Sequence, residues 1–200
     1  MTEQLGSCVV QGKTEVFRQM PNYSTIEYAG RILWSLVHPL FRYSPRICFG
    51  WRRLLLRAFG ARIGKRVRIY GSAHIYLPWM FSIGDDSAVG EHALIYCLGP
   101  VKIGNKVTIS QRTHLCAGTH DYRNPSFPLI RSPITVEDDA WVCADAFVGP
   151  GVTVHQGAIV GARAAVFKDC DPFTIYGGNP ARALKARDAT TRYVTGNTAV

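Results

Sequence analysis

The segment Thr119-His120-Asp121 holds the side chain of this sequence that is best suited to move a proton near neutral pH. Imidazole has an ordinary pKa close to physiological pH, so a positioned histidine can remove a proton from a hydroxyl group. Cys116 precedes His120 by four residues, and such a pair suggests a nucleophilic thiol beside its base. Residues four apart converge on an α-helix but rarely in a chain of short strands. We therefore expect Cys116 to be a core residue, and His120 is kept as the candidate proton acceptor.

A repeat of six residues surrounds this segment and predicts the element that positions it. From Val136 to Cys170, each block of six begins with valine, and its fifth residue is small or β-branched. This period fits neither a helical turn nor the alternation of a simple strand. It is typical of a chain that makes a short strand and a corner every six residues, with three sides closing one coil. The sequence therefore predicts an all-β fold, a parallel β-helix.

One coil of this predicted solenoid contains an insertion. Aliphatic positions give coil starts at residues 63, 83, 103, 136 and 154, which makes about five coils. The step from 103 to 136 exceeds three six-residue sides by 15 residues and places the insertion at 119–133. A solenoid carries insertions on one face, usually the binding face, and a long loop in a regular core indicates function. Because His120 opens this loop and Trp141 follows it, we favour catalysis over an ordinary surface histidine.

The segments outside the solenoid predict a cap and a tail. We interpret residues 1–25 as a disordered lead-in, 26–62 as a basic amphipathic helical cap, 63–176 as the β-helix, and 177–200 as a turn, a short helix and a tail. Apolar residues recur at helical spacing in the cap, at Ile26, Ala29, Leu33, Leu36, Val37 and Leu40. Pro180 suits the first turn of the predicted C-terminal helix.

The predicted cap is strongly basic. The chain has a formal net charge of +9, and no Asp or Glu lies between Tyr28 and Gly84. Two interpretations of this asymmetry remain open. The segment is either a structural cap over the open end of the β-helix, or a cap that also contacts an anionic membrane surface. No nucleic-acid recognition module accompanies the basic residues, so nucleic acid is not expected as a partner.

The composition is that of a folded protein from a reducing compartment. Apolar residues make up 47% and charged residues 18% of the chain, which argues against disorder. Six cysteines are scattered without a Cys-x-x-Cys pair, which predicts reduced thiols and a cytoplasmic protein. The first residues lack the pattern of a signal peptide, and no apolar run approaches the ~20 residues of a membrane span.

Several motifs together resemble the hexapeptide-repeat O-acetyltransferases, especially those of colanic-acid and exopolysaccharide biosynthesis. They are the hexapeptides, the Thr-His-Asp loop, the VGPGVT and GAIVGARAAVFKD coils, and the closing GGNPA. The resemblance covers roughly residues 46–187. It implies a left-handed β-helix, a homotrimer, and acetyl-CoA bound in a groove between subunits. It also implies acetylation of a sugar hydroxyl on a saccharide or lipid-linked sugar acceptor.

The resemblance further implies roles for individual residues. His120 matches the general base. The positions that match the cofactor-binding residues are Trp141, Ala144, Ala162, Lys168, Arg182 and Lys185. The candidates for acceptor binding are Asp121, Arg123, Tyr96 and His92. An asparagine that binds sugar in the galactoside enzymes has no counterpart here, where His92, Ala93 and Tyr96 stand instead, so the acceptor stays open.

A zinc enzyme on the same fold is the alternative. The γ-type carbonic anhydrases bind zinc through three histidines across a subunit interface. Candidate nitrogens here belong to His92, His114, His120 and His155. Zinc needs three converging ligands, whereas His114 and His120 are expected on different sides of a coil, and GGNPA has no role in that chemistry. We therefore expect no metal, and the basic C-terminal turn argues against a catalytically silent scaffold.

Overall fold

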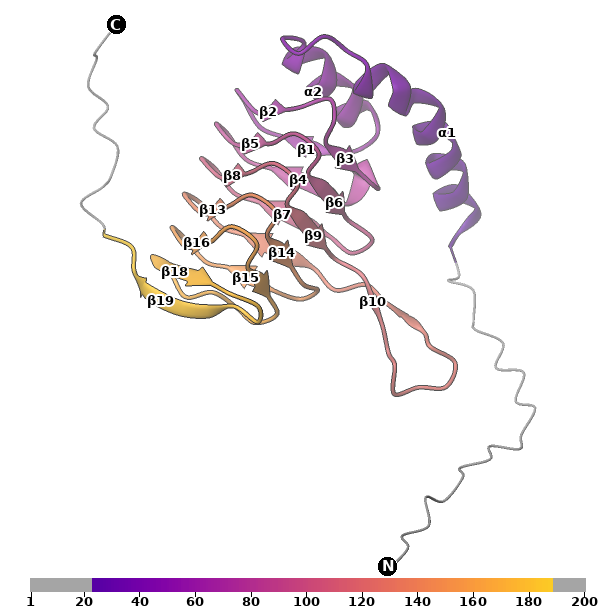
Figure 1. Ribbon diagram of the computed structural model, residues 1–200. Helices are drawn as coiled ribbons and strands as arrows, with labels where there is room; N and C mark the ends of the chain where they lie inside the picture. The colour runs from indigo at the N-terminus through magenta and orange to yellow at the C-terminus, as the bar shows by residue number, and fades with distance from the viewer. Residues whose placement is uncertain (1–22, 189–200) are drawn as a thin grey trace, which may run out of the picture.

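Three parallel sheets form the sides of a solenoid in the computed structural model, which describes residues 23–188 (Figure 1). The first face consists of β1 (Arg62–Ile63), β4 (Phe81–Ile83), β7 (Val101–Ile103), β12 (Ile134–Val136) and β15 (Thr153–Val154). The second face consists of β2 (Arg68–Ile69), β5 (Ala88–Val89), β8 (Thr108–Ile109), β13 (Trp141–Val142), β16 (Ile159–Val160), β18 (Thr174–Gly177) and the antiparallel β19 (Arg182–Ala186). The third face consists of β3 (His74–Ile75), β6 (Leu94–Tyr96), β9 (His114–Cys116), β14 (Phe147–Val148) and β17 (Ala165–Val166).

The inward residues of these strands explain why the chain closes into coils. Aliphatic side chains of the second face stack in register and are fully buried, in a column formed by Ile69, Val89, Ile109, Val142 and Val160. Burying this column removes apolar surface from water in every coil, which is the main stabilising contribution to the fold. A sixth turn begins where Cys170 bridges Val154 and β18 pairs with β16. The predicted left-handed β-helix of about five coils is confirmed.

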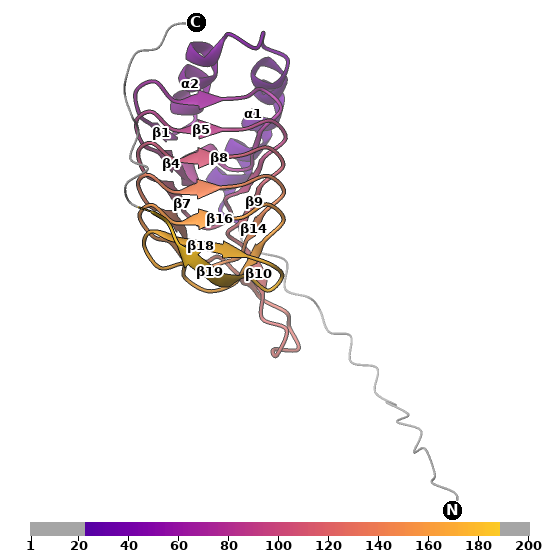
Figure 2. The same ribbon diagram turned by 60° about the vertical axis from the view of Figure 1, so that its left-hand side comes forward.

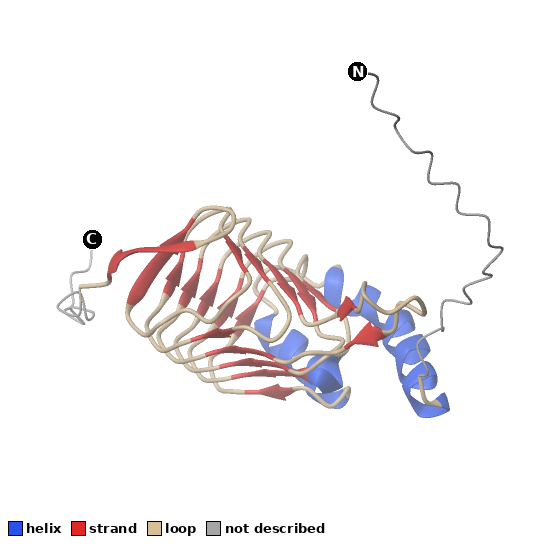
Figure 3. Ribbon diagram, turned by 90° about the horizontal axis from the view of Figure 1, so that it is seen from below, coloured by secondary structure: helices blue, strands red, loops and turns tan. Residues whose placement is uncertain are grey.

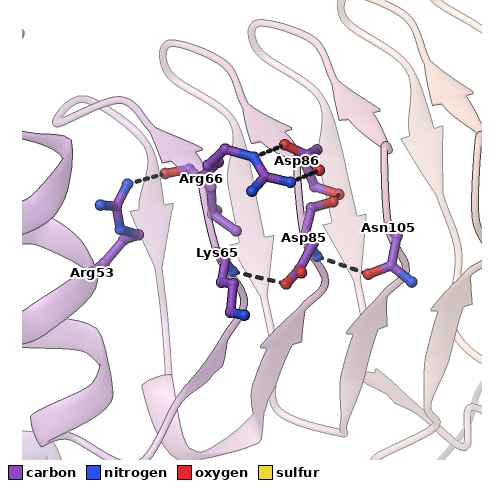
Figure 4. A network of polar contacts seen from close by, with 8 residues as sticks. Arg53, Lys65, Arg66, Asp85, Asp86 and Asn105 are labelled. Atoms are coloured by element: carbon purple, nitrogen blue, oxygen red, sulfur yellow. Dashed lines mark hydrogen bonds and ion pairs between the residues drawn. The ribbon is translucent and has the colours of Figure 1, made fainter.

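The corner between the first and second faces shows how successive coils are joined (Figure 4). The Oδ1 atom of Asp85 accepts a hydrogen bond from the backbone N–H of Lys65 at 2.8 Å, and the Oδ1 of Asn105 accepts one from Asp85 at 2.8 Å. A Cβ atom at Gly84 would lie 2.5 Å from that Asn105 oxygen, so this close approach requires glycine. Asp86 follows with a left-handed backbone, at φ 59°. The corner sequence therefore encodes both the turn and the contact with the next coil.

Two helices cover the N-terminal end of the solenoid (Figures 2 and 3). α1 (Thr25–Arg42) begins at Ser24, whose hydroxyl caps the first turn, and it packs inward through the buried Trp34 and Phe41. α2 (Phe49–Ala58) follows and lies against β1 and β2. Within residues 23–188, neither helix is long and apolar enough to cross a membrane.

Three arginines of α2 close the open end of the first coil. The fully buried Arg52 donates to the carbonyl oxygen of Ile69 at 2.7 Å, and Arg53 donates to that of Val67 at 2.9 Å. Arg57 donates to the carbonyl oxygen of the last residue of β1 at 2.6 Å. In every later coil, the carbonyl oxygens at these positions accept hydrogen bonds from N–H groups of the preceding coil. The first coil has no preceding coil to supply these donors. The guanidinium groups therefore replace the missing coil.

Two expectations about the ends need correction. The predicted C-terminal helix after Pro180 is wrong, because Arg182–Ala186 forms the strand β19 and pairs antiparallel with β18. Pairing of β19 with β18 supplies hydrogen-bond partners to the backbone groups at the free edge of the second face. This gain outweighs the local preference of Pro180 for the first turn of a helix. The predicted lead-in at 1–25 lies largely outside the described residues, but its last residues are ordered, since Ser24 caps α1.

Candidate active site

The insertion leaves the solenoid as a short antiparallel pair of strands. β10 (Thr119–His120) pairs with β11 (Leu129–Ile130), so that His120 lies opposite Leu129. The pair projects away from the coils at the corner between the third and first faces (Figure 1). Beyond it, β12 resumes the first face in register with β7. His120 is therefore held on a paired strand at the base of the insertion, next to a rigid solenoid.

The imidazole of His120 is oriented by Phe127, across the insertion. Its Nδ1 atom lies 2.9 Å from the backbone oxygen of Phe127, and the two rings stack at 4.5 Å with an interplanar angle of 10°. A carbonyl oxygen can only accept, so this contact assigns the proton to Nδ1 and leaves the lone pair of Nε2 free. The His120 side chain is exposed. It is therefore in the tautomer that a general base requires.

Asp121 shapes the tip of the insertion. Its N–H donates to the carbonyl oxygen of Pro128 at 3.0 Å, and its Oδ1 accepts the N–H of Arg123 at 3.0 Å. Arg123 lies over the ring of Tyr122, at 5.6 Å from the ring centre. These contacts direct the carboxylate of Asp121 to the loop backbone instead of to the imidazole of His120.

The two remaining acceptor candidates lie at different corners. Tyr96 ends β6 and is in register with Cys116, four residues before His120, and its ring packs 4.8 Å from that of Tyr76. His92 lies at the corner between the second and third faces, where its N–H donates to Ser72 at 3.1 Å. The structure thus brings Tyr96, but not His92, to the side from which the insertion projects.

The cofactor candidates fall into separate groups within one chain. Ala144 and Ala162 share the corner between the second and third faces, where the N–H of Arg163 donates to Ala144 at 2.9 Å. Trp141 points outward from the second face, is 44% exposed, and donates to the hydroxyl of Ser110 at 2.9 Å. A single subunit therefore carries Trp141 and His120 on different sides of the solenoid.

The basic cofactor candidates lie toward the C-terminal end. Lys168 is exposed at the corner between the third and first faces, the same corner that carries the insertion in an earlier coil. Arg182 and Lys185 are exposed on β19. Their positive charges are thus displayed beyond the last complete coils.

The thiols and the remaining histidines have structural surroundings. Burial raises the pKa of the Cys97 thiol to about 11, and the half-buried Cys116 donates to the carbonyl oxygen of Gly118 at 3.3 Å. Burial lowers the pKa of His114, whose ring packs 5.3 Å from that of Phe147. His155 contacts Glu137 at 3.2 Å. Within the described part of the chain, no three His, Cys, Asp or Glu residues come together as metal ligands.

Sequence reasoning missed two contacts of the insertion. Phe127 carries no periodic signal, because its role depends on how the loop folds back on His120 and on its left-handed backbone, at φ 51°. Arg131, at the return of the loop, pairs with Glu27 of α1 at 3.2 Å and lies 4.8 Å from the ring centre of Tyr23. The base of the insertion is therefore fixed to the first turn of α1, a contact between residues 104 positions apart in the chain.

Known proteins resemble this chain both in sequence and in fold. No family model matches the chain. The WcaF protein of Escherichia coli (strain K12), assigned to colanic acid biosynthesis as an acetyltransferase, is 39% identical over 160 residues. That alignment covers 80% of this chain and 88% of the relative.

Solved structures share the solenoid. The hexapeptide-repeat acetyltransferase VCA0836 of Vibrio cholerae, complexed with acetyl coenzyme A, has a TM-score of 0.74 at 26% identity, with 82% of this chain and 90% of that chain covered. A maltose O-acetyltransferase from Clostridium difficile 630 has a TM-score of 0.74 at 20% identity, with the same coverage of 82% and 90%. The alignment with WcaF covers most of both chains, and the solved acetyltransferase structures share the solenoid fold. The chain therefore belongs to the hexapeptide-repeat acetyltransferases, in the family of the colanic acid biosynthesis acetyltransferase.

Proposed function

We propose that this enzyme transfers an acetyl group from acetyl-CoA to a hydroxyl group of a saccharide, with His120 as the general base. The tautomer of His120 carries this proposal, because Nδ1 donates to Phe127 and Nε2 is left free. Nε2 takes the proton of the sugar hydroxyl group while the oxygen of that hydroxyl attacks the carbonyl carbon of the thioester. The carbon–sulfur bond then breaks, and the proton on Nε2 passes to the departing thiolate of coenzyme A.

We infer that acetyl-CoA binds between subunits of a homotrimer. Trp141 of one face and His120 of the insertion lie on different sides of one chain, so a site that uses both draws them from two neighbours. The complex of the Vibrio cholerae acetyltransferase with acetyl coenzyme A supports acetyl-CoA as the acetyl donor of this enzyme. Ala144 and Ala162 would leave room beside the pantetheine chain. The side chains of Lys168, Arg182 and Lys185 would bind the phosphate groups of coenzyme A.

The third face supplies a surface that a neighbouring subunit would cover. Its outward side chains are largely apolar or aromatic, and Phe167 is 59% exposed. The imidazole Nε2 of His114 is buried on this face without a hydrogen-bond partner among the described residues. Aromatic rows of this kind are enriched where subunits meet.

The acceptor would lie on the side of the insertion, against Tyr96, Asp121 and Arg123. A tyrosine ring can stack on a sugar ring, and Arg123 can bind an anionic substituent. The relation to a colanic acid biosynthesis acetyltransferase supports a saccharide of exopolysaccharide biosynthesis. We further infer that the reaction takes place in the cytoplasm, where a peripheral contact with the inner membrane would reach a lipid-linked acceptor.

The test is replacement of the proposed base. His120→Ala should lower acetyl transfer on the order of 10²–10⁴-fold, because the hydroxyl loses its proton acceptor. Transfer is measured as release of coenzyme A thiol in the presence of saccharide acceptors. His155→Ala is the matched control, because His155 lies near Glu137 outside the insertion. Near-normal turnover in the His120 variant would remove His120 from the catalytic role.

A calorimetric titration with acetyl-CoA separates donor binding from chemistry. Wild type and His120→Ala should both bind acetyl-CoA saturably, since His120 acts on the acceptor hydroxyl. The metal content of the same sample addresses the zinc alternative. Stoichiometric zinc without acetyl-CoA binding would overturn the transferase proposal and favour carbonic-anhydrase-like chemistry.

A further inference from the structure

The outward side of α1 is apolar along its length. Its large side chains recur at steps of seven, three, four and three residues and are strongly exposed: Ile26 85%, Leu33 55%, Leu36 72%, Leu40 57% and Tyr43 81%. The opposite side packs on the solenoid through Trp34 and Phe41, which are buried. Most residues whose spacing predicted this helix therefore form its exposed side. We call Ile26, Leu33, Leu36, Leu40 and Tyr43 the outer stripe.

The outer stripe continues past the end of the helix. Ile47 is 85% exposed, and the Trp51 indole donates to the carbonyl oxygen of Leu40 at 3.1 Å. Trp51 and Leu54, which are 42% and 58% exposed, extend the apolar surface onto α2. A contiguous apolar surface of this kind marks an interaction site.

The charged residues of α1 leave the outer stripe free of acidic groups. Glu27 is turned toward the insertion, where it pairs with Arg131, and Arg31 donates to the hydroxyl of Tyr76. At the C-terminal end of the stripe lie Arg42, which donates to the carbonyl oxygen of Ser72 at 3.3 Å, and Arg46, whose 72% exposed side chain pairs with Glu91 at 3.4 Å. Two arginines thus border the apolar surface, and the segment between Tyr28 and Gly84 supplies no Asp or Glu to it.

The arginines of α2 do not belong to this border. Arg52, Arg53 and Arg57 donate to carbonyl groups of the first coil and are needed there. The basic composition of the cap therefore serves two purposes. One set of arginines completes the solenoid, and Arg42 and Arg46, which also contact the solenoid through Ser72 and Glu91, lie beside the outer stripe.

We propose that the outer stripe docks this enzyme onto a bilayer that contains anionic lipid. The leucines and isoleucines would lie at the boundary between headgroups and acyl chains, and Arg42 and Arg46 would contact lipid phosphates. Tyr43 and Trp51 suit the same boundary, because each has a largely apolar ring with one polar atom at its edge. This surface needs no acetyl transfer to bind, so it goes beyond the proposed reaction.

A second copy of the chain is the competing occupant. Steps of three and four residues also occur in coiled coils, where oppositely charged flanking residues select the partner. The outward side of α1 offers no acidic residue for such pairing, since its one glutamate is bound to Arg131. The stripe carries no acidic residue of its own, and the arginines beside it are complementary to an anionic surface.

Docking in this way would also orient the active site. Arg131 ties the base of the insertion to the first turn of α1, and α1 and β10 lie on the same side of the molecule (Figure 1). A membrane along the outer stripe would therefore hold His120 near the lipid surface, where a lipid-linked sugar is anchored.

Vesicle co-sedimentation of the full chain tests this proposal. We compare phosphatidylcholine vesicles with vesicles that also contain phosphatidylglycerol. Wild type should bind the anionic vesicles, and binding should weaken as salt rises. The double variant Leu36→Ser and Leu40→Ser should bind at least about tenfold more weakly, because two side chains lose their apolar contact with lipid. Leu184→Ser, at a 66% exposed leucine on β19, should bind like wild type.

A charge variant tests the border separately. Arg46→Ser should weaken binding to anionic vesicles and leave the weaker binding to phosphatidylcholine alone unchanged. The replaced side chains are exposed, so melting temperatures should stay near that of wild type.

Three results would overturn the proposal. Wild type could remain in the supernatant with both kinds of vesicle, or the double variant could sediment like wild type. The double variant could also lose oligomeric mass in light scattering without lipid, which would assign the stripe to contact between copies. Acetyl transfer to a soluble saccharide is measured without vesicles, so failure here leaves the proposed reaction standing.

Discussion

At the residue scale, the chemistry of His120 depends on a partner that the sequence pattern does not reveal. Position 120 could be chosen from the sequence because the six-residue period breaks there and imidazole is suited to proton transfer. The partner could not, since Phe127 reaches the ring only after the insertion folds back on itself. The six-residue sequence period reflects contacts that recur in every coil, whereas the contact between Phe127 and His120 occurs once.

Phe127→Ala tests this positioning role. Loss of the stacked ring should let the imidazole turn, and kcat should fall on the order of tenfold while acetyl-CoA affinity is unchanged. Phe127→Tyr keeps an aromatic ring in place and should retain most of the rate. Steady-state kinetics and calorimetry measure the two quantities, with Pro125→Ala, in the exposed part of the loop, as control. An unchanged kcat, or a loss of acetyl-CoA binding, would contradict the positioning role.

At the element scale, the solenoid and the helices of its N-terminal cap were predictable, whereas the C-terminal strand and the contacts of the cap were not. Coil positions follow from the sequence because every coil repeats the same local requirements, such as a buried aliphatic residue and a corner like that at Gly84. The ends depend on what lies beside them in space. Pro180 suggested a helix, yet the free edge of β18 takes up β19 as a strand. At the other end, arginines that looked like a uniform basic surface bind the carbonyl groups of the first coil.

Arg52→Ala should be the most damaging of the cap substitutions. Arg52 is fully buried and donates to four oxygen atoms within 3.0 Å, those of Ile69, Pro45, Arg46 and the Ser44 hydroxyl. Its removal takes a charged donor away from each of these acceptors, and the free energy of unfolding should fall by about 3 kcal/mol or more.

Urea unfolding followed by circular dichroism measures this change. Arg62→Ala is the control, because Arg62 is an exposed residue of the neighbouring strand β1. Equal midpoints for the two variants would show that the carbonyl groups of the first coil do not need the guanidinium.

At the scale of the whole molecule, the packing of α1 on the solenoid couples stability to pH. Burial lowers the pKa of His38 and of His74, and the positive charge of Arg42 acts in the same direction on both. Their rings lie 5.2 Å apart beside α1, in a cavity of about 280 Å³ that Arg31, Trp34 and Tyr76 also line. The lowered pKa values favour the neutral form of both histidines where the helix meets the third face.

The melting temperature should fall as the pH drops below about 6.5, the ordinary pKa of histidine. In that range the unfolded chain binds protons that the folded chain excludes, so the unfolded state gains stability. His38→Phe preserves aromatic packing and should flatten this dependence, whereas His92→Ala, at an exposed corner, should not. Thermal unfolding followed by circular dichroism across the range measures both. A dependence of the same steepness in His38→Phe would contradict the assignment.

The insertion begins and ends at almost the same point of the solenoid. Thr119 pairs with Ile130, and β12 rejoins β7 in the register of an uninterrupted coil. The solenoid therefore fixes the distance between the ends of the loop, and a change in loop length costs little, since closure entropy grows only with the logarithm of length. Within the coils, each substitution meets a neighbour above and below. Descendants of this scaffold can thus diverge by exchanging one segment while the solenoid is inherited intact, and grafting residues 119–133 between relatives is the corresponding route for redesign.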